Sequence, residues 1–180
     1  MQSGPSNGPS GPSGSSGLSG SSGPSGPSGP SGTGGEVNVV NAFNDTLQSV
    51  APNGFVQFPS GGFTGTAINF NFLNGTAFFN QLGRYKITYG LKVLGPSNSP
   101  FRALLAGLPI PASRHNFRSQ IDTTNTYRME TIEFVIGVTT LGDSLTIQNN
   151  SNNNVTIGDP PETGVPDAVS AYVVIERLGD

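Results

Sequence analysis

The chain of 180 residues has no cysteine, no tryptophan and few charges. Without cysteine it can form no disulfide framework and carry out no thiol chemistry. Eight Lys and Arg against eleven Asp and Glu give a net charge of −3, so the basic surface that nucleic acids require is missing. No apolar run approaches the roughly 20 residues of a membrane span. The composition therefore predicts neither nucleic-acid binding nor membrane insertion.

Glycine, in contrast, is abundant, and near the N-terminus it recurs at every third position. The repeat runs through Gly8, Gly11, Gly14, Gly17, Gly20, Gly23, Gly26, Gly29, Gly32 and Gly35, after an interruption at Asn7. Only glycine fits at the crowded axis where three polyproline-II-like chains wind together. The spacing predicts a collagen-like stalk over residues 1–35 and hence a homotrimer. The alternative is a flexible Gly/Ser linker.

This stalk is poorly equipped to assemble by itself. It is short, and it has no charged residue before Glu36, so ion pairs between chains cannot set its register. We therefore expect the rest of the chain, residues 36–180, to hold three chains together as a trimerisation head.

The head shows the alternation of apolar and polar residues that is typical of β-strands. In residues 84–93, Tyr85, Ile87 and Tyr89 share one face while Lys86 and Thr88 share the other. Residues 127–138, 145–147 and 169–176 repeat the pattern, and the segments between them contain the turn-forming residues Gly, Pro and Asn. No segment has a convincing helical period. The pattern predicts an all-β sandwich or jelly roll.

Phenylalanine is concentrated in the first half of the head. A domain of this size does not easily bury so many rings, and apolar surface left on a monomer is normally interface. The sequence thus predicts trimer-interface candidates, with ordinary core positions for about half of them as the alternative. The candidates are Phe55, Phe58, Phe70, Phe72, Phe78 and Phe79.

One motif resembles the signature of serine esterases, Gly142-Asp-Ser-Leu145. That chemistry needs a histidine base oriented by an acid. The only histidine is His115, and no aspartate stands three residues before it. We interpret Gly142-Asp143 as a turn between two strands, and we expect no catalytic residue and no enzymatic activity.

Three further groups of polar residues are candidates for binding. Arg114, His115 and Arg118 form a small basic loop that could contact a ligand, although a solvated loop is the simpler interpretation. Glu130 and Glu133 are three apart on a predicted strand, so they point to opposite faces and cannot flank one substrate. Asp159, Glu162 and Asp167 lie in an acidic loop and have the oxygen ligands that calcium prefers, but their spacing matches no known calcium loop. We therefore predict no metal and no cofactor.

Several motifs, in this order, resemble the collagen-like glycoproteins of the Bacillus exosporium. After the collagen-like run come Gly83-Arg-Tyr-Lys-Ile-Thr88 and the hairpin-like Leu105-Ala-Gly-Leu-Pro-Ile-Pro111. Gly142-Asp-Ser-Leu-Thr-Ile-Gln-Asn149 and Ala171-Tyr-Val-Val-Ile-Glu-Arg-Leu178 follow. The triplets here are mainly Gly-Pro-Ser, whereas that family uses mainly Gly-Pro-Thr.

The resemblance implies a jelly roll of the tumour-necrosis-factor and complement-globular-head type, assembled as a tight homotrimer. It further implies a structural filament protein on the outer surface of a spore, with O-linked glycans on the stalk. Related collagen-plus-head proteins on phages and large viruses make a virion or phage fibre tip the alternative location. A trimeric module that binds a receptor or a glycan is the alternative function.

Overall fold

The computed structural model describes residues 36–94, 99–117, 129–158 and 169–179. The predicted stalk, residues 1–35, lies outside the described residues, as do Arg118 and the acidic loop with Asp159, Glu162 and Asp167. The described part of the head is built from antiparallel strands, with one short 3-10 turn, η1, at Pro111–Ser113. The prediction of an all-β architecture is confirmed.

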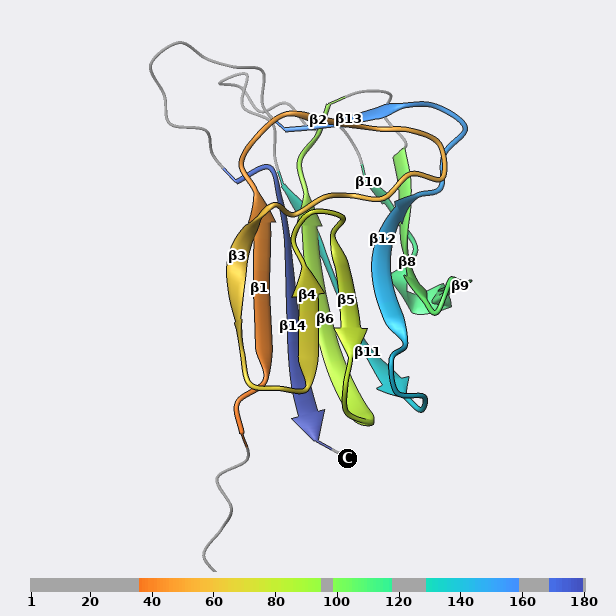
Figure 1. Ribbon diagram of the computed structural model, residues 1–180. Coiled ribbons are helices and arrows are strands. Elements are labelled where there is room, and N and C mark those ends of the chain that lie inside the picture. Colours follow the sequence, from red (N-terminus) through yellow and green to blue (C-terminus); the bar gives the residue numbers. More distant parts are fainter. Residues whose placement is uncertain (1–35, 95–98, 118–128, 159–168, 180) are drawn as a thin grey trace, which may run out of the picture. The chain divides into compact units, whose positions relative to one another are not determined.

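The first sheet has five strands in the order β11-β6-β14-β1-β3. Its long strands are those with the clearest alternation in the sequence, and the first and last strands of the head, β1 and β14, lie side by side at its centre (Figure 1). The strands are β1 (Val39–Asn44), β3 (Ser60–Thr64), β6 (Gly83–Leu91), β11 (Glu130–Val138) and β14 (Ala171–Gly179).

The second sheet, of six strands, has the order β10-β8-β12-β5-β4, with β9 paired to β8. It is made of β4 (Ile68–Asn71), β5 (Thr76–Phe79), β8 (Ser99–Leu105), β9 (Leu108–Pro109), β10 (His115–Phe117) and β12 (Ser144–Asn149). A third, small sheet joins β2 (Gln48–Val50), β13 (Val155–Ile157) and β7 (Val93–Leu94) at one end of the sandwich (Figure 1).

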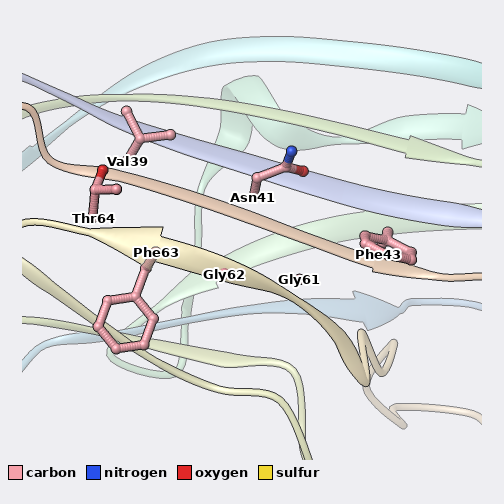
Figure 2. A pocket seen from close by; sticks show the side chains of 7 residues that line it. All are labelled: Val39, Asn41, Phe43, Gly61, Gly62, Phe63 and Thr64. Atoms are coloured by element: carbon pink, nitrogen blue, oxygen red, sulfur yellow. The ribbon is translucent and has the colours of Figure 1, made fainter.

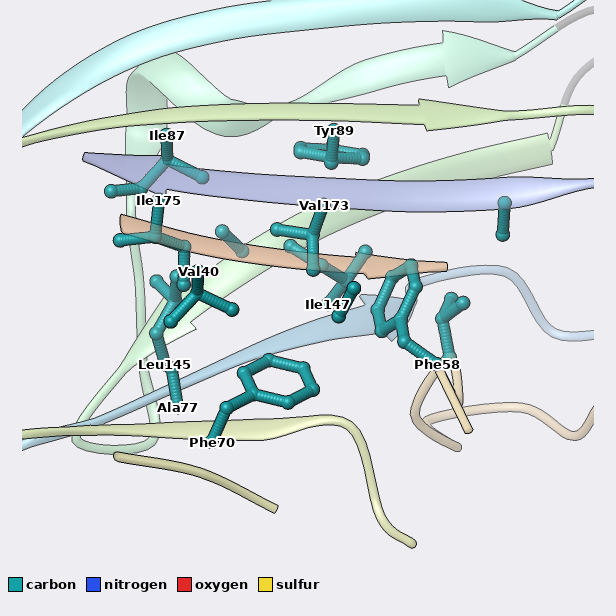
Figure 3. Packing of buried hydrophobic residues seen from close by; sticks show 14 of the residues in the cluster. Val40, Phe58, Phe70, Ala77, Ile87, Tyr89, Leu145, Ile147, Val173 and Ile175 are labelled. Atoms are coloured by element: carbon teal, nitrogen blue, oxygen red, sulfur yellow. The ribbon is translucent and has the colours of Figure 1, made fainter. Parts of the chain in front are cut away.

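The core lies between the two large sheets. Every second residue of β6 is buried there, so Tyr85, Ile87, Tyr89 and Leu91 have no exposed surface. Figure 3 shows side chains from β1, β6 and β14 meeting those of the six-stranded sheet. On the opposite face of the five-stranded sheet, Arg84 is exposed and Lys86 and Thr88 are half-buried, so within the described ranges no second layer covers this face.

Two buried polar side chains, Tyr89 and Asn149, form hydrogen bonds to backbone carbonyl oxygens. The Tyr89 hydroxyl donates to the Ser113 carbonyl oxygen at 2.8 Å, which ties β6 to η1. Burial raises the pKa of Tyr89 well above its ordinary value of about 10. At the end of β12, the Asn149 amide donates to the carbonyl oxygens of Val50, Ala51 and Asn153 and thereby closes the loop after this strand.

Candidate functional site

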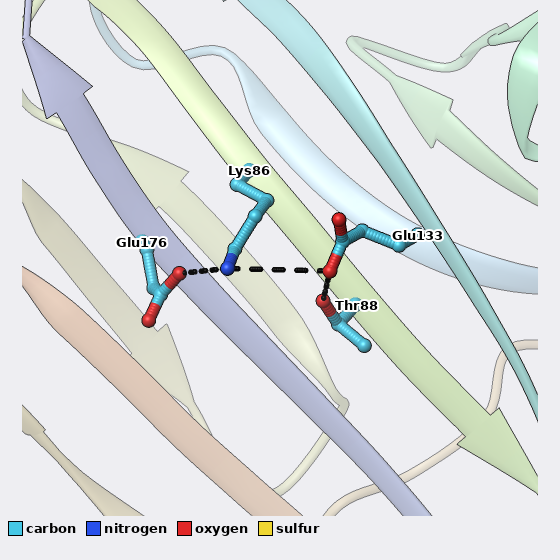
Figure 4. A network of polar contacts seen from close by, with 4 residues as sticks. All are labelled: Lys86, Thr88, Glu133 and Glu176. Carbon is cyan, nitrogen blue, oxygen red and sulfur yellow. Dashed lines mark hydrogen bonds and ion pairs between the residues drawn. The ribbon is translucent and has the colours of Figure 1, made fainter.

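The uncovered face of the five-stranded sheet, here called the outer face, carries a network of charges at its centre. Lys86 on β6 is the direct cross-strand neighbour of Glu176 on β14, and their Nζ and Oε2 atoms are 2.6 Å apart. Glu133 on β11 lies 4.0 Å from the same ammonium group and accepts a hydrogen bond of 3.2 Å from the Thr88 hydroxyl (Figure 4). The hydrogen bond and charge of Glu176 raise the pKa of Lys86.

Glu133 and Glu130 do not form a pair of carboxylates around a common site. The two residues point to opposite sides of β11, as predicted: Glu133 joins the outer-face network, whereas Glu130 contacts His115 on the other side. They cannot flank one substrate.

An aromatic ring covers the next row of the outer face. Tyr172 on β14 is the cross-strand neighbour of Gly90 on β6, and a Cβ atom at Gly90 would lie only 2.3 Å from the tyrosine ring. The Tyr172 hydroxyl reaches beyond β6 and lies 2.9 Å from the Thr131 hydroxyl on β11. Glycine is therefore required at position 90 because the ring lies directly over it.

Towards the β3 edge, the outer face has a hollow of about 560 Å³. Two consecutive glycines, Gly61 and Gly62, leave part of this surface without side chains, and a Cβ atom at Gly62 would meet nothing within 4 Å. Figure 2 shows Val39 and Thr64 on one side of the sheet and the Phe63 ring on the other. The full lining is Val39, Asn41, Phe43, Gly61, Gly62, Phe63 and Thr64.

The phenylalanine candidates for the trimer interface divide into three groups. Phe58, Phe70 and Phe79 are buried in the core of a single chain, so their assignment to an interface is wrong and the alternative, an ordinary core position, holds. Phe72 is partly buried and packs against the same core. Phe55 and Phe78 are exposed over 46% and 37% of their surface, and for them an interface role stays a prediction.

Sequence reasoning missed the apolar part of the outer face, where Val39, Phe43 and Val174 are half-buried. Their signal was present in the alternation itself. Val40, Ala42 and Val173 are buried, and successive residues of a strand point to opposite faces. Their sequence neighbours must therefore face outward. In a strand that serves only as one side of a sandwich, those positions are normally polar.

In the basic loop, the structure places Arg114 and His115 at the edge of the six-stranded sheet. The His115 Nε2 atom lies 3.0 Å from the Glu130 Oε2 atom, so the imidazole links β10 to β11, the strands at the edges of the two sheets. Arg114 precedes β10 and is exposed.

The esterase-like motif forms a turn, as predicted. Gly142 has a positive φ of 82°, and Ser144 begins β12. His115 on β10 and Asn149 on β12 both pair with Phe101 on β8, so His115 lies level with Asn149 in the sheet. Asn149 is five residues from Ser144 along β12, which is roughly 16 Å in the strand direction. The histidine therefore cannot serve as a base for this serine in the arrangement observed.

Two further features of the described residues concern metal binding and the membrane. No group of three or more His, Asp or Glu side chains is placed to hold a metal ion within the described ranges. Over the same ranges, no helix has the length and apolar character needed to cross a membrane.

Comparison with solved structures gives the type of sandwich. The Eiger TNF of S. frugiperda is similar with a TM-score of 0.53 at 11% identity, over 81% of this chain and 94% of that chain. The head has a tumour-necrosis-factor-like jelly-roll fold.

Two further similar structures are rabbit GITRL and the globular domain of zebrafish complement 1qA. Their TM-scores are 0.47 and 0.49 at 12% and 13% identity, over 78% and 77% of this chain and 93% and 94% of theirs. No protein-family model and no curated protein matches the sequence. Membership of the Bacillus exosporium glycoproteins stays a prediction.

Proposed function

We propose that this protein is a structural filament protein, in which the jelly-roll head trimerises and nucleates a collagen-like triple helix. The observation that carries the proposal is the direct connection between the two parts: the glycine repeat ends at Gly35, and β1 begins at Val39. A triple helix brings three chains together around one axis. The three β1 strands must therefore begin close to that axis.

This requirement indicates which surface the heads would share. The first residue of β1, Val39, pairs with Glu176 near the end of β14 and also lines the hollow beside Gly62. The five-stranded sheet contains β1, the strand that follows the stalk in sequence, and its outer face is the surface that we propose neighbouring heads share. The half-buried apolar side chains Val39, Phe43 and Val174 on that face favour contact with protein over contact with water.

The head also provides what the stalk lacks. Without charges before Glu36, the stalk has no ion pairs with which to select partners or register. Once three heads are associated, closure of the triple helix becomes effectively intramolecular. The likeness in fold to the Eiger TNF supports the jelly roll that the resemblance to the exosporium glycoproteins implies. Display on an outer surface, a spore exosporium or else a virion or phage fibre, follows from that resemblance.

The test is the mass of the full chain in solution and its response to Gly62→Phe. Light scattering of the wild-type protein, followed through dilution to nanomolar concentration, should give three times the 18.5 kDa of one chain. Because the space around Gly62 is open within one chain, a phenyl ring fits the monomer but occupies the hollow. We expect Gly62→Phe to give folded monomers.

Asn69→Phe is the matched control, since Asn69 is exposed on β4 in the other sheet. This variant should remain trimeric. A wild-type chain that is monomeric would contradict the proposed function. A trimer that survives Gly62→Phe would show that the heads associate through another surface.

A further inference from the structure

A second concave site lies away from the outer face, beside the edge strand β10. Its lining consists of Pro100, Phe101, Arg114, His115, Asn116 and Asn150, and its volume is about 300 Å³. Pro100 is half-buried and gives the site an apolar component, whereas Arg114 and Asn116 are exposed and the Phe101 side chain is buried in the core. Ligand sites typically combine apolar walls with a few convergent polar groups, at volumes that begin near 300 Å³.

Backbone and side-chain hydrogen bonds fix the walls of this cleft. His115 pairs with Phe101 in the ladder between β10 and β8. On the opposite wall, the Asn150 N–H donates to the Pro100 carbonyl oxygen at 2.8 Å. The contact of 3.0 Å between His115 Nε2 and Glu130 Oε2 fixes the position of the imidazole. The cleft is thus formed by elements that are already paired, which lowers the cost of ordering them on binding.

The polar groups of the lining favour an anion. Arg114, Asn116 and Asn150 can donate hydrogen bonds, His115 Nε2 already contacts Glu130, and none of the lining residues is acidic. Within the described ranges, no carboxylate forms an ion pair with the Arg114 guanidinium. A guanidinium group binds a carboxylate through two parallel charge-assisted hydrogen bonds. The lining therefore fits a ligand that carries a carboxylate.

We propose that this cleft binds an acidic sugar residue of the uronic acid type, with its carboxylate on Arg114. The amides of Asn116 and Asn150 can each donate to and accept from sugar hydroxyls, and the apolar carbons of the half-buried Pro100 suit the C–H face of a pyranose ring. The volume accommodates one such ring. This binding activity goes beyond the structural role proposed above, and binding at one cleft does not depend on trimerisation.

Titration calorimetry of the full-length protein with a disaccharide that ends in glucuronic acid tests the proposal. The methyl ester of the same disaccharide is the matched ligand control, because it keeps the ring and removes the charge. We expect the acid to bind and the ester to bind at least tenfold more weakly. Arg114→Gln should weaken binding of the acid at least tenfold, since a charge-assisted pair contributes about 1.5–3 kcal/mol.

Arg84→Gln is the control variant. It removes the same charge from an exposed arginine on β6 outside the cleft and should leave the affinity unchanged. Equal affinity for acid and ester, no effect of Arg114→Gln, or an equal effect of Arg84→Gln would overturn the proposal. So would an absence of binding at millimolar sugar, or equally tight binding of a short acidic peptide, which would indicate a peptide site.

Discussion

Single residues on the outer face show how closely its side chains are fitted together. Gly90 lies beneath the Tyr172 ring, and the space between the Gly90 Cα atom and that ring is too small for a methyl group. Gly137, on β11 of the same sheet, has open space where its Cβ would be. Glycine is thus obligatory at one of these positions and incidental at the other.

We predict that Gly90→Ala lowers the free energy of unfolding by about 1–3 kcal/mol, because the added methyl group forces the Tyr172 ring away from β6. The displacement also breaks the contact of 2.9 Å between the Tyr172 and Thr131 hydroxyls. Urea denaturation at one fixed protein concentration measures the change, since association would make the apparent stability depend on concentration. Gly137→Ala should change stability by less than about 0.5 kcal/mol. Equal effects of the two substitutions would contradict this description of the face.

Tyr89 provides a residue-level prediction about pH. Its pKa is raised by burial, so the folded chain retains the phenolic proton above pH 10, whereas the unfolded chain releases it. The contribution to stability is therefore complete below about pH 10 and is lost as the pH rises towards the folded-state pKa. In that range one retained proton lowers the free energy of unfolding by about 1.4 kcal/mol per pH unit.

Tyr89→Phe should remove this part of the pH dependence. At neutral pH the variant should be less stable by about 0.5–1.5 kcal/mol, because the hydrogen bond to the Ser113 carbonyl oxygen is lost. The difference should shrink as the pH rises above 10. Denaturation curves between pH 8 and pH 11 measure it, and parallel pH profiles for the two proteins would contradict the assignment.

At the level of elements, the hairpin between β8 and β9 contains a local conflict between sequence and geometry. Leu105 pairs with Leu108, so the turn has two central residues, Ala106 and Gly107, with φ values of 49° and 78°. Positive φ at both central positions defines a type I′ turn, for which Asn-Gly is the preferred sequence. Alanine is a poor choice at the first position because its Cβ is strained there.

We predict that Ala106→Asn stabilises the protein by about 0.5–1 kcal/mol, since asparagine tolerates the left-handed region. Ala106→Val should have the opposite effect, because a β-branched side chain is strained more severely at positive φ. Thermal unfolding of the three proteins at equal concentration measures both changes. A melting temperature that falls for Ala106→Asn would show that the turn geometry is different.

Long strands could be predicted from the sequence, and short ones could not. In β6 and β11 the alternation persists over nine residues each, which sets both the strand and its buried face. In contrast, β4 and β5 have four residues each. Between them lies a turn whose length sets the register, and adjacent residues such as Phe78 and Phe79 exchange faces if that register shifts by one. The division of the phenylalanines between core and surface therefore required the structure.

The candidate sites were predictable to different extents. The basic loop was identified from its charges, but its pairing with Glu130 depends on how two separate sheets come together at their edges. The hollow beside Gly62 had no sequence signal, because consecutive glycines in a strand equally suit a bulge or a bend. Turn chemistry, by comparison, is local, and Gly142-Asp143 was interpreted correctly from the sequence alone.

At the level of the whole molecule, the proposed function assigns different roles to the head and the stalk. In this proposal the head supplies the association of three chains through the outer face, and the stalk depends on that association for its own winding. This order follows from composition: the stalk has neither charges nor an apolar core, whereas the head has both a core and an uncovered apolar surface. Unfolding of the stalk should therefore precede dissociation of the chains.

The most direct test warms the full-length protein while its mass is followed by light scattering and its stalk by circular dichroism. The account predicts that the polyproline-II-type signal of the stalk melts first, while the mass remains at three times 18.5 kDa. Dissociation should follow only when the β-sheet signal of the head is lost. A mass that falls to that of one chain in the same transition as the stalk would contradict the claim that the head holds the trimer together.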